Sequence, residues 1–159
     1  HSGHPPQRTV PITFNLLLNL AAACNPENPD VLWGYIAAYA PGTTPQNAPM
    51  LAILVDGALH YYNDFVKPAK QYKTPNDAER AALKEVHNVV AALPENATEE
   101  EIQTAIFTVG KNHGYEKNLR DWFQLMYEVL FGQPQGPRMG SFVKLYGKDA
   151  TLKLIAEKI

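Results

Sequence analysis

The stretch TVPITFNLLLNLAAACN, residues 9–25, decides the fold class, because its apolar residues fall on almost every side of a helix. Thr9 is the expected N-cap of this helix, and Pro11 is tolerated in its first turn. A helix that is apolar all round must lie at the centre of a bundle, where neighbouring helices cover each side. The stretch therefore predicts an all-α, multi-helix bundle.

The rest of the chain agrees with this prediction, because further segments have apolar residues at helical spacing. These segments span residues 28–42, 47–70, 77–94, 97–115, 118–132, 138–147 and 149–159. Pro68 is expected to stop the second of them, and Thr98 with Glu101 forms a capping box at the start of the fourth. Gly114 is expected to end a helix, and Gly147 to be the hinge between the last two. No alternating apolar run predicts a strand, so we expect seven or eight helices.

Composition and charge limit the classes of protein to which the chain can belong. The 159 residues carry a net charge of -2, and the single cysteine, Cys24, lies in an apolar stretch that suits a buried, inert thiol. No apolar run is long enough to span a membrane and no secretory signal is present, so we expect a cytoplasmic protein. Charge is unevenly distributed: residues 76–107 carry -5 and residues 108–159 carry +3. The last third is therefore the part expected to face phosphate.

Asp56, His60 and Asp64 are spaced four residues apart, so a regular helix places them on one face, as a metal or acid–base site requires. No second cluster of such residues supplies the remaining ligands. We interpret this line as the edge where an amphipathic helix turns to solvent, and we expect no metal site. The same helix must bury its opposite side, formed by Leu59, Tyr62 and Phe65.

Two segments combine aromatic and basic residues in a way that suits RNA. Trp33 falls off the apolar face of segment 28–42, and Arg138 and Lys144 belong to GPRMGSFVKLYG, residues 136–147. Unstacked bases are bound by stacking on aromatic or guanidinium planes, and cations attract phosphate. Gly136 and Gly140 are expected to let a partner's backbone approach closely.

Several segments together resemble one family, the C-terminal region of class I lysyl-tRNA synthetases. They are VPITFNLLLNLAAACN (10–25), VLWGYIAAYAPG (31–42), YYNDFVKPAK (61–70) and NLRDWFQLMYEVLFGQPQGPRMGSFVKLYG (118–147). The resemblance runs from about His4 to the C-terminus, and its most specific part is GQPQGPRMGSFVKLYG, residues 132–147. It implies a helical anticodon-binding domain of the α-helix cage type over residues 11–159. Residues 1–10 are then a linker from an absent catalytic region, with leading residues that are either native or artificial.

The resemblance also implies what the chain binds. The parent enzyme ligates lysine to tRNA-Lys with ATP, whereas this fragment performs no chemistry and holds no cofactor. Its expected partners are the tRNA-Lys anticodon stem-loop and the catalytic domain in cis, with no membrane and no DNA. The expected contacts are Arg138 and Lys144 near the loop, Lys111 on the backbone, and Trp33 or Tyr35 as a stacking surface.

The opening His1-Ser2-Gly3-His4 matches the ATP-binding His-x-Gly-His of class I synthetases, but its context differs. That motif must follow a core strand and open a helix in a Rossmann fold. Here Pro5 follows directly and no mononucleotide-binding pattern comes after it. We therefore interpret the match as a coincidence within the linker.

Three alternatives remain open from the sequence. A glutamyl-type tRNA anticodon-binding domain shares the architecture and differs in the tRNA bound. A helical protein-interaction scaffold would use exposed Trp33 or Tyr61 as its interface. A small metalloenzyme would use Asp56, His60 and Asp64.

Overall fold

The computed structural model describes residues 12–159, which form helices and no strands, as the sequence predicted. Eight α-helices are present: α1 (Phe14–Cys24), α2 (Pro29–Tyr39), α3 (Pro49–Tyr61), α4 (Asp77–Ala92), α5 (Glu99–Gly110), α6 (Leu119–Leu130), α7 (Met139–Tyr146) and α8 (Lys148–Lys158). Short helical turns of a different pitch follow two of them: the π-turns η1 (Tyr62–Val66) and η3 (Lys111–Tyr115). A 3-10 turn, η2 (Lys67–Ala69), continues from η1.

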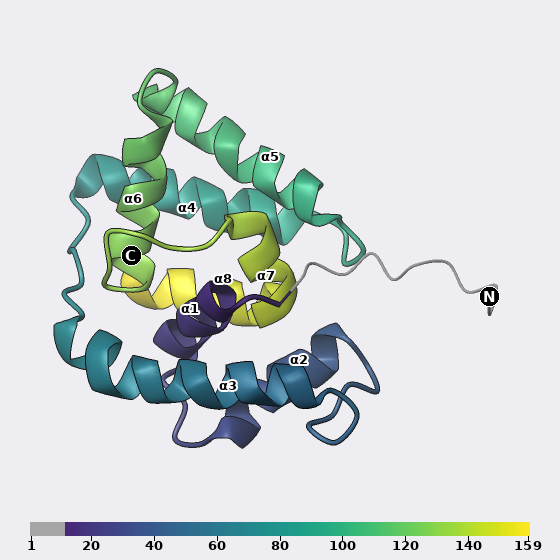
Figure 1. Ribbon diagram of the computed structural model, residues 1–159. Helices are drawn as coiled ribbons and strands as arrows, with labels where there is room; N and C mark the ends of the chain where they lie inside the picture. The colour runs from purple at the N-terminus through teal and green to yellow at the C-terminus, as the bar shows by residue number, and fades with distance from the viewer. Residues whose placement is uncertain (1–11) are drawn as a thin grey trace.

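The helices form two groups that α7 and α8 join (Figure 1). One group consists of α1, α2 and α3, and the other of α4, α5 and α6. Helix α7 packs on α1 and α2 from the first group and on α5 from the second, while α8 packs on α4, α6 and α7. Helix α7 therefore connects the two groups, and α8 packs beside it on the second group.

Helix α1 lies in the interior, as its sequence predicted. Leu17, Leu20 and Ala21 are fully buried. The helix begins later than expected, at Phe14, because the Thr13 hydroxyl accepts a hydrogen bond from the Leu16 N–H and caps the first turn. The expected cap, Thr9, and the expected linker, residues 1–10, lie outside the described residues.

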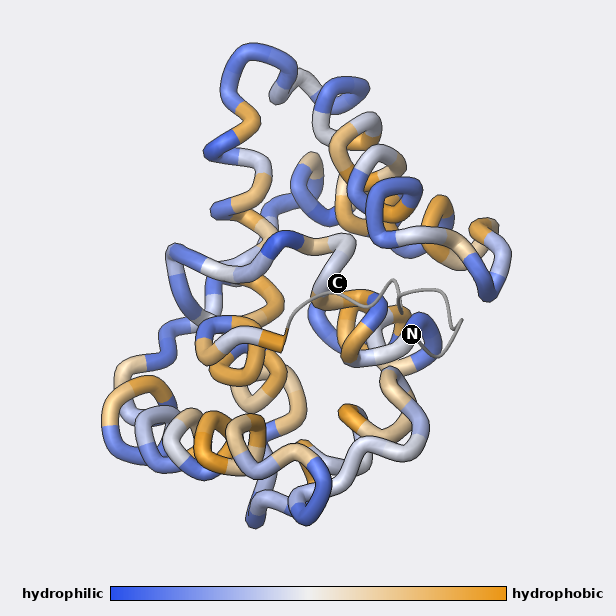
Figure 2. The backbone as a smooth tube through the Cα atoms, turned by 45° about the vertical axis from the view of Figure 1, so that its right-hand side comes forward, coloured by the Kyte–Doolittle hydropathy of each residue, from blue (hydrophilic) through white to orange (hydrophobic). Residues whose placement is uncertain are grey.

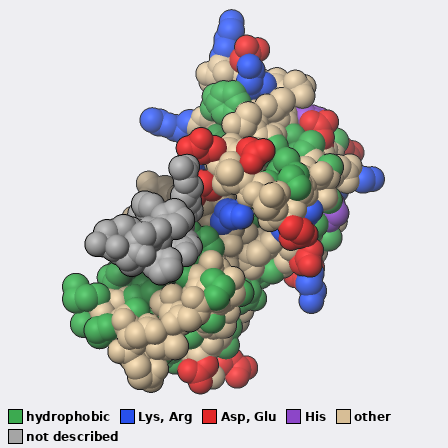
Figure 3. Space-filling view, turned by 90° about the vertical axis from the view of Figure 1, so that its right-hand side faces the viewer, with side chains coloured by type: hydrophobic (Ala, Val, Ile, Leu, Met, Phe, Trp, Pro, Cys, Tyr) green, Lys and Arg blue, Asp and Glu red, His purple; other side chains and the backbone are tan. Residues whose placement is uncertain are grey.

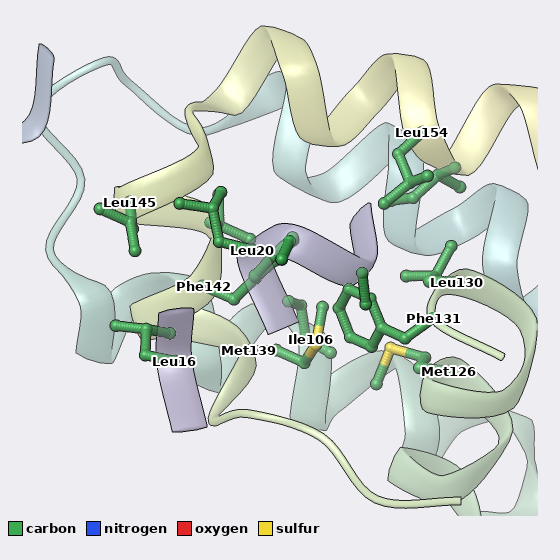
Figure 4. Close-up of a cluster of buried hydrophobic side chains, with 14 of the residues drawn as sticks. Leu16, Leu20, Ile106, Met126, Leu130, Phe131, Met139, Phe142, Leu145 and Leu154 are labelled. Atoms are coloured by element: carbon green, nitrogen blue, oxygen red, sulfur yellow. The ribbon is translucent and has the colours of Figure 1, made fainter. Parts of the chain in front are cut away.

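A mixed aromatic and aliphatic core fills the space between the two groups. Figure 4 shows Leu20 of α1, Ile106 of α5, Met126 of α6 and Phe142 of α7 lying against one another. In Figure 2 hydrophobic and hydrophilic turns alternate along most helices, as expected for helices with one buried face. Trp122, the largest buried side chain, donates its indole N–H to the Ile106 carbonyl at 3.1 Å, so its polar atom is satisfied.

Segment 47–70 ends where the sequence predicted, but the expected burial of its last aromatic residue is wrong. Helix α3 changes to the π-turn η1 at Tyr62, and η2 ends the helical run around Pro68. Leu59 and Tyr62 are buried as expected, but the Phe65 side chain is 63% exposed. The wider π-turn rotates Phe65 away from the core, because each of its residues advances less around the axis than in an α-helix.

Other local expectations are confirmed. Thr98 and Glu101 form a reciprocal capping box at the start of α5. Gly114 (φ +91°) breaks the helical path after α5, and Gly147 (φ +98°) is the pivot between α7 and α8. Burial raises the pKa of the Cys24 thiol to about 11, in agreement with an inert cysteine.

Candidate nucleic-acid interface

Arg138 stands at the N-cap of α7 and faces the first turn of α5. One of its guanidinium nitrogens lies 3.2 Å from Glu99 Oε1, and the Arg138 side chain is 48% exposed. The other carboxylate oxygen of Glu99 is buried and has no hydrogen-bond partner within residues 12–159. The Arg138 side chain is thus about half open to solvent, while a carboxylate holds one of its guanidinium nitrogens.

Gly140 and Gly136 have a different role from the one predicted. A Cβ on Gly140 would collide with the Glu99 carbonyl oxygen, and a Cβ on Gly136 would collide with the Tyr127 ring. The Gly140 N–H donates to Gln103 Oε1 at 2.8 Å. The close approach that glycine permits is therefore made by the chain's own α5 and α6, and the expectation that a partner's backbone uses this space is corrected.

Lys144 binds the connection between α4 and α5 through its ammonium group. Its ammonium group donates to the Ala97 carbonyl at 3.0 Å, and the ammonium group of Lys148 donates to the Leu93 carbonyl at 2.6 Å. Both lysines line a cavity of about 250 Å³ between α2, α4, α7 and the α4–α5 connection. Lys144 thus lies at a cavity, as a ligand-binding residue would, but its ammonium group already donates a hydrogen bond to the Ala97 carbonyl.

Tyr35 packs on α7 through Tyr146, with ring centroids 5.0 Å apart. Burial raises the pKa of both phenols, so both are neutral hydrogen-bonding groups at physiological pH. The two rings line a second, more open cavity of about 510 Å³ that adjoins the first at Gly147 and Lys148. The structure therefore brings Tyr35 and Lys144 to one junction between α2 and α7.

Trp33 lies elsewhere on α2. Two residues along a helix correspond to about 200°, so Trp33 and Tyr35 point to nearly opposite sides and cannot stack on the same base. The Trp33 side chain is half-buried and packs partly on the core. Its predicted exposure is therefore only partial.

Lys111 lies apart from the other predicted cations, at the far end of α5. Twelve helical residues separate the two ends of α5, which corresponds to roughly 18 Å from the Arg138 contact. Lys117 lies in the same exposed α5–α6 turn, at the top of Figure 1, and Arg120 lies in the first turn of α6. None of the three forms an ion pair within residues 12–159. These two residues were not among the predicted contacts, although their nearness to Lys111 in the chain was a usable signal.

Charged side chains gather on one part of the surface. In Figure 3 the Lys and Arg side chains of the visible face lie on its upper and middle parts, and the lower end shows hydrophobic and neutral side chains with a few carboxylates. The lower end is formed by the group of α1, α2 and α3. Carboxylates lie among these cations in Figure 3, and residues 76–107, which include α4 and most of α5, carry a net charge of -5. Phosphate attraction is therefore expected only around the cations of residues 108–159.

Asp56, His60 and Asp64 do not form a ligand cluster. The His60 ring nitrogen Nδ1 donates within its own helix to the Asp56 carbonyl at 2.8 Å. Asp64 lies in η1, where the change of pitch takes it out of line with the other two. Within the described part of the chain, no three His, Cys, Asp or Glu side chains are placed to hold a metal ion.

None of the described helices is long and apolar enough to cross a membrane. A family model described as an anticodon binding domain matches residues 42–159. Lysine–tRNA ligases from Rickettsia bellii (strain OSU 85-389), Rickettsia felis and Rickettsia akari are 46%, 42% and 43% identical to the chain over 160 residues. These alignments cover 100% of the chain and 30% of each relative's length. No solved structure matches the chain.

Proposed function

Since the chain belongs to the anticodon-binding domain family, and tRNA is therefore its partner, we propose that it recognises the anticodon stem-loop of tRNA-Lys. The observation that carries this proposal is the similarity of the whole chain to proteins named lysine–tRNA ligase, at 42–46% identity. The chain spans 30% of the length of these relatives. In this proposal the ligation of lysine with ATP, in the cytoplasm, is performed by a catalytic region that is linked in cis.

The surface charge supports this proposal. Residues 108–159 carry a net charge of +3, whereas residues 76–107 carry -5. Lys111, Lys117 and Arg120 are exposed cations without an ion pair within residues 12–159. Each cation that neutralises a phosphate releases a counterion, so binding through this turn would weaken as the salt concentration rises.

Among the five sequence-predicted contacts, we propose different roles. Arg138 and Lys111 would contact RNA directly, because their charged groups are accessible. Lys144 and Tyr35 would hold the shape of the α2–α7 junction, since the Lys144 ammonium donates to the Ala97 carbonyl and the Tyr35 ring packs on Tyr146. Trp33 remains a candidate stacking surface through the open part of its ring.

A titration with the tRNA-Lys anticodon stem-loop tests the proposal. NMR spectra of the labelled chain detect weak binding, which is expected because the isolated domain lacks the second grip on the tRNA that a linked catalytic region provides. Stem-loops with altered anticodon bases and the tRNA-Glu stem-loop serve as competitors at two salt concentrations. Preference for the lysine anticodon is expected. Equal binding to all stem-loops would refute lysine specificity, and preference for tRNA-Glu would assign the glutamyl-type alternative.

Arg138→Ala is expected to weaken stem-loop binding without unfolding the domain. Arg80→Ala is the matched control, because Arg80 is similarly exposed at 41% and pairs with Asp77 on the acidic part of the surface. Equal affinities of the two variants would remove Arg138 from the interface.

A helical protein-interaction scaffold is the second candidate, and one observation favours it. Met50 and Ile53, three residues apart on α3, are 77% and 68% exposed. Apolar side chains of this size in one stripe suit a protein contact. Replacing both residues by Ser is expected to leave RNA binding unchanged, and a loss of RNA binding would contradict a purely protein-directed role for the stripe.

A further inference from the structure

A third cavity, of about 400 Å³, shares no lining residue with the two at the α2–α7 junction and lies between α1, the end of α3 and the segment that follows α6. Its floor includes Leu18 and Val66, and Gly132 to Gly136 form one wall. Gly132 (φ +71°) turns the chain there, and an added Cβ would press on Lys70. The wall is therefore held close to the η1–η2 segment by the backbone itself.

Two exposed aromatic side chains line this cavity. Tyr61 is 45% exposed and Phe65 is 63% exposed, and their ring centroids lie 5.0 Å apart. The π-turn η1 is the direct cause, because it rotates Phe65 out of the core and places it beside Tyr61. Single-turn π-bulges within helices are frequently found at functional sites. An accessible pair of rings is the surface that an unstacked nucleic-acid base requires.

The opposite wall carries hydrogen-bonding groups that the fold does not use. Within residues 12–159, the side-chain amides of Gln133 and Gln135 make no hydrogen bond. An amide offers both a donor and an acceptor, which matches the mixed edge of a base. Rings on one wall and free amides on the other thus meet in one cavity.

The charge of the cavity suits a base better than a phosphate. Its lining contains no charged side chain, whereas the two cavities at the α2–α7 junction both include Glu95. The charged residues that flank Phe65 and Val66 in the chain, Asp64 and Lys67, are of opposite sign. A neutral site of this kind neither repels nor specifically attracts the backbone of RNA.

We infer that this cavity receives one unstacked base of the anticodon loop. Phe65 and Tyr61 stack on the base, and the amides of Gln133 and Gln135 contact its edge. The inference rests on the proposed function, since it names a base subsite of the same RNA ligand. It adds a specificity determinant that lies away from the cations of the α5–α6 turn.

The test combines a variant of the chain with a changed RNA. Phe65→Ala removes the more exposed ring, and Ile53→Ala is the matched control, because Ile53 is 68% exposed on the preceding helix α3 but does not line the cavity. Each chain is titrated with the tRNA-Lys anticodon stem-loop and with a series in which one loop nucleotide at a time lacks its base. Stacking on an aromatic ring typically changes affinity by about tenfold.

Phe65→Ala is expected to bind the intact stem-loop about tenfold more weakly than Ile53→Ala, in line with the usual effect of one stacked base. One abasic stem-loop is expected to bind the unchanged chain more weakly by a similar factor and to show no further loss with Phe65→Ala. An equal effect of Phe65→Ala on every stem-loop, or no effect on any, would overturn the inference and leave the proposed function intact. Absence of binding by the unchanged chain would overturn both.

Discussion

Replacing Gly140 by alanine tests how α5 and α7 fit together, because the two interpretations of this glycine give opposite results. In the structure a Cβ on Gly140 meets the Glu99 carbonyl oxygen and the Gln103 side chain. A carbonyl within a helix cannot move aside alone, so α7 must shift away from α5. The substitution is therefore expected to destabilise the fold, although alanine is normally favoured over glycine in a helix.

The magnitude follows from three opposing effects. Overpacking of a tight contact costs about 1–3 kcal/mol. Moving α7 also weakens the hydrogen bond from the Gly140 N–H to Gln103 Oε1, a bond worth about 1 kcal/mol. The gain in helix propensity offsets about 1 kcal/mol. We expect the free energy of unfolding to fall by about 1–3 kcal/mol.

Urea unfolding, followed by circular dichroism, measures this change, and Gly34→Ala is the matched control. Gly34 lies within α2, and no atom stands within 4 Å of the position that its Cβ would take. Alanine there is expected to stabilise the protein by about 0.5–1 kcal/mol. The midpoints of the two variants should move in opposite directions at an unchanged slope. A Gly140→Ala protein that is as stable as the unchanged chain but binds RNA poorly would refute the packing argument and restore the interpretation of Gly140 as a partner's approach site.

Three further predictions concern single side chains. Lys70→Met is expected to lower the free energy of unfolding by about 1–3 kcal/mol, because the Lys70 ammonium donates to the Ala22 carbonyl at 2.9 Å and its removal leaves that carbonyl unpaired. Chemical denaturation of the variant and of the unchanged chain measures this loss. Alkylation of Cys24 is expected to be slow at pH 8 and to accelerate toward pH 11, because burial raises the pKa of the thiol to about 11; a rate that levels off below pH 9 would contradict this. Burial raises the pKa of Glu79, but hydrogen bonds from the backbone of Asn76 and from Lys73 outweigh this effect and lower the pKa overall. The Glu79 carboxylate therefore stabilises the fold above its unfolded-state pKa of about 4.3, and this stabilisation is lost as the pH falls below that value. Glu79→Gln should therefore reduce stability at pH 7 and make no difference at strongly acidic pH, as measured by urea unfolding at each pH.

Local patterns predicted the helices well, because each pattern records which side of one helix is apolar. Segment boundaries marked by Thr98, Gly114 and Gly147 agree with the structure, since caps and positive φ angles depend on a few neighbouring residues. Phe65 shows where this reasoning stops. Helical spacing assumes a constant pitch, and the π-turn after α3 changes that pitch without a sequence signal that periodicity detects.

The candidate site depends on contacts that cross the bundle, and these were not predictable from spacing. Arg138 meets Glu99, 39 residues earlier in the chain, and Lys144 meets the carbonyl of Ala97. A single sequence gives the residue type at each position but not the partner that packing brings to it. The base-sized cavity with Gln133 and Phe65 was missed for the same reason, because its two walls come from segments far apart in the chain.

Helix α7 has a consequence for how the protein is made. It packs on α1 and α2, yet the ribosome synthesises it only after α3, α4, α5 and α6 have followed them. Chains begin to fold from the N-terminus during synthesis, so α1 must keep an apolar face without its final neighbour while those four helices emerge. This interval is when the nascent chain is most open to aggregation or to a chaperone, and slowing translation after α6 would lengthen it.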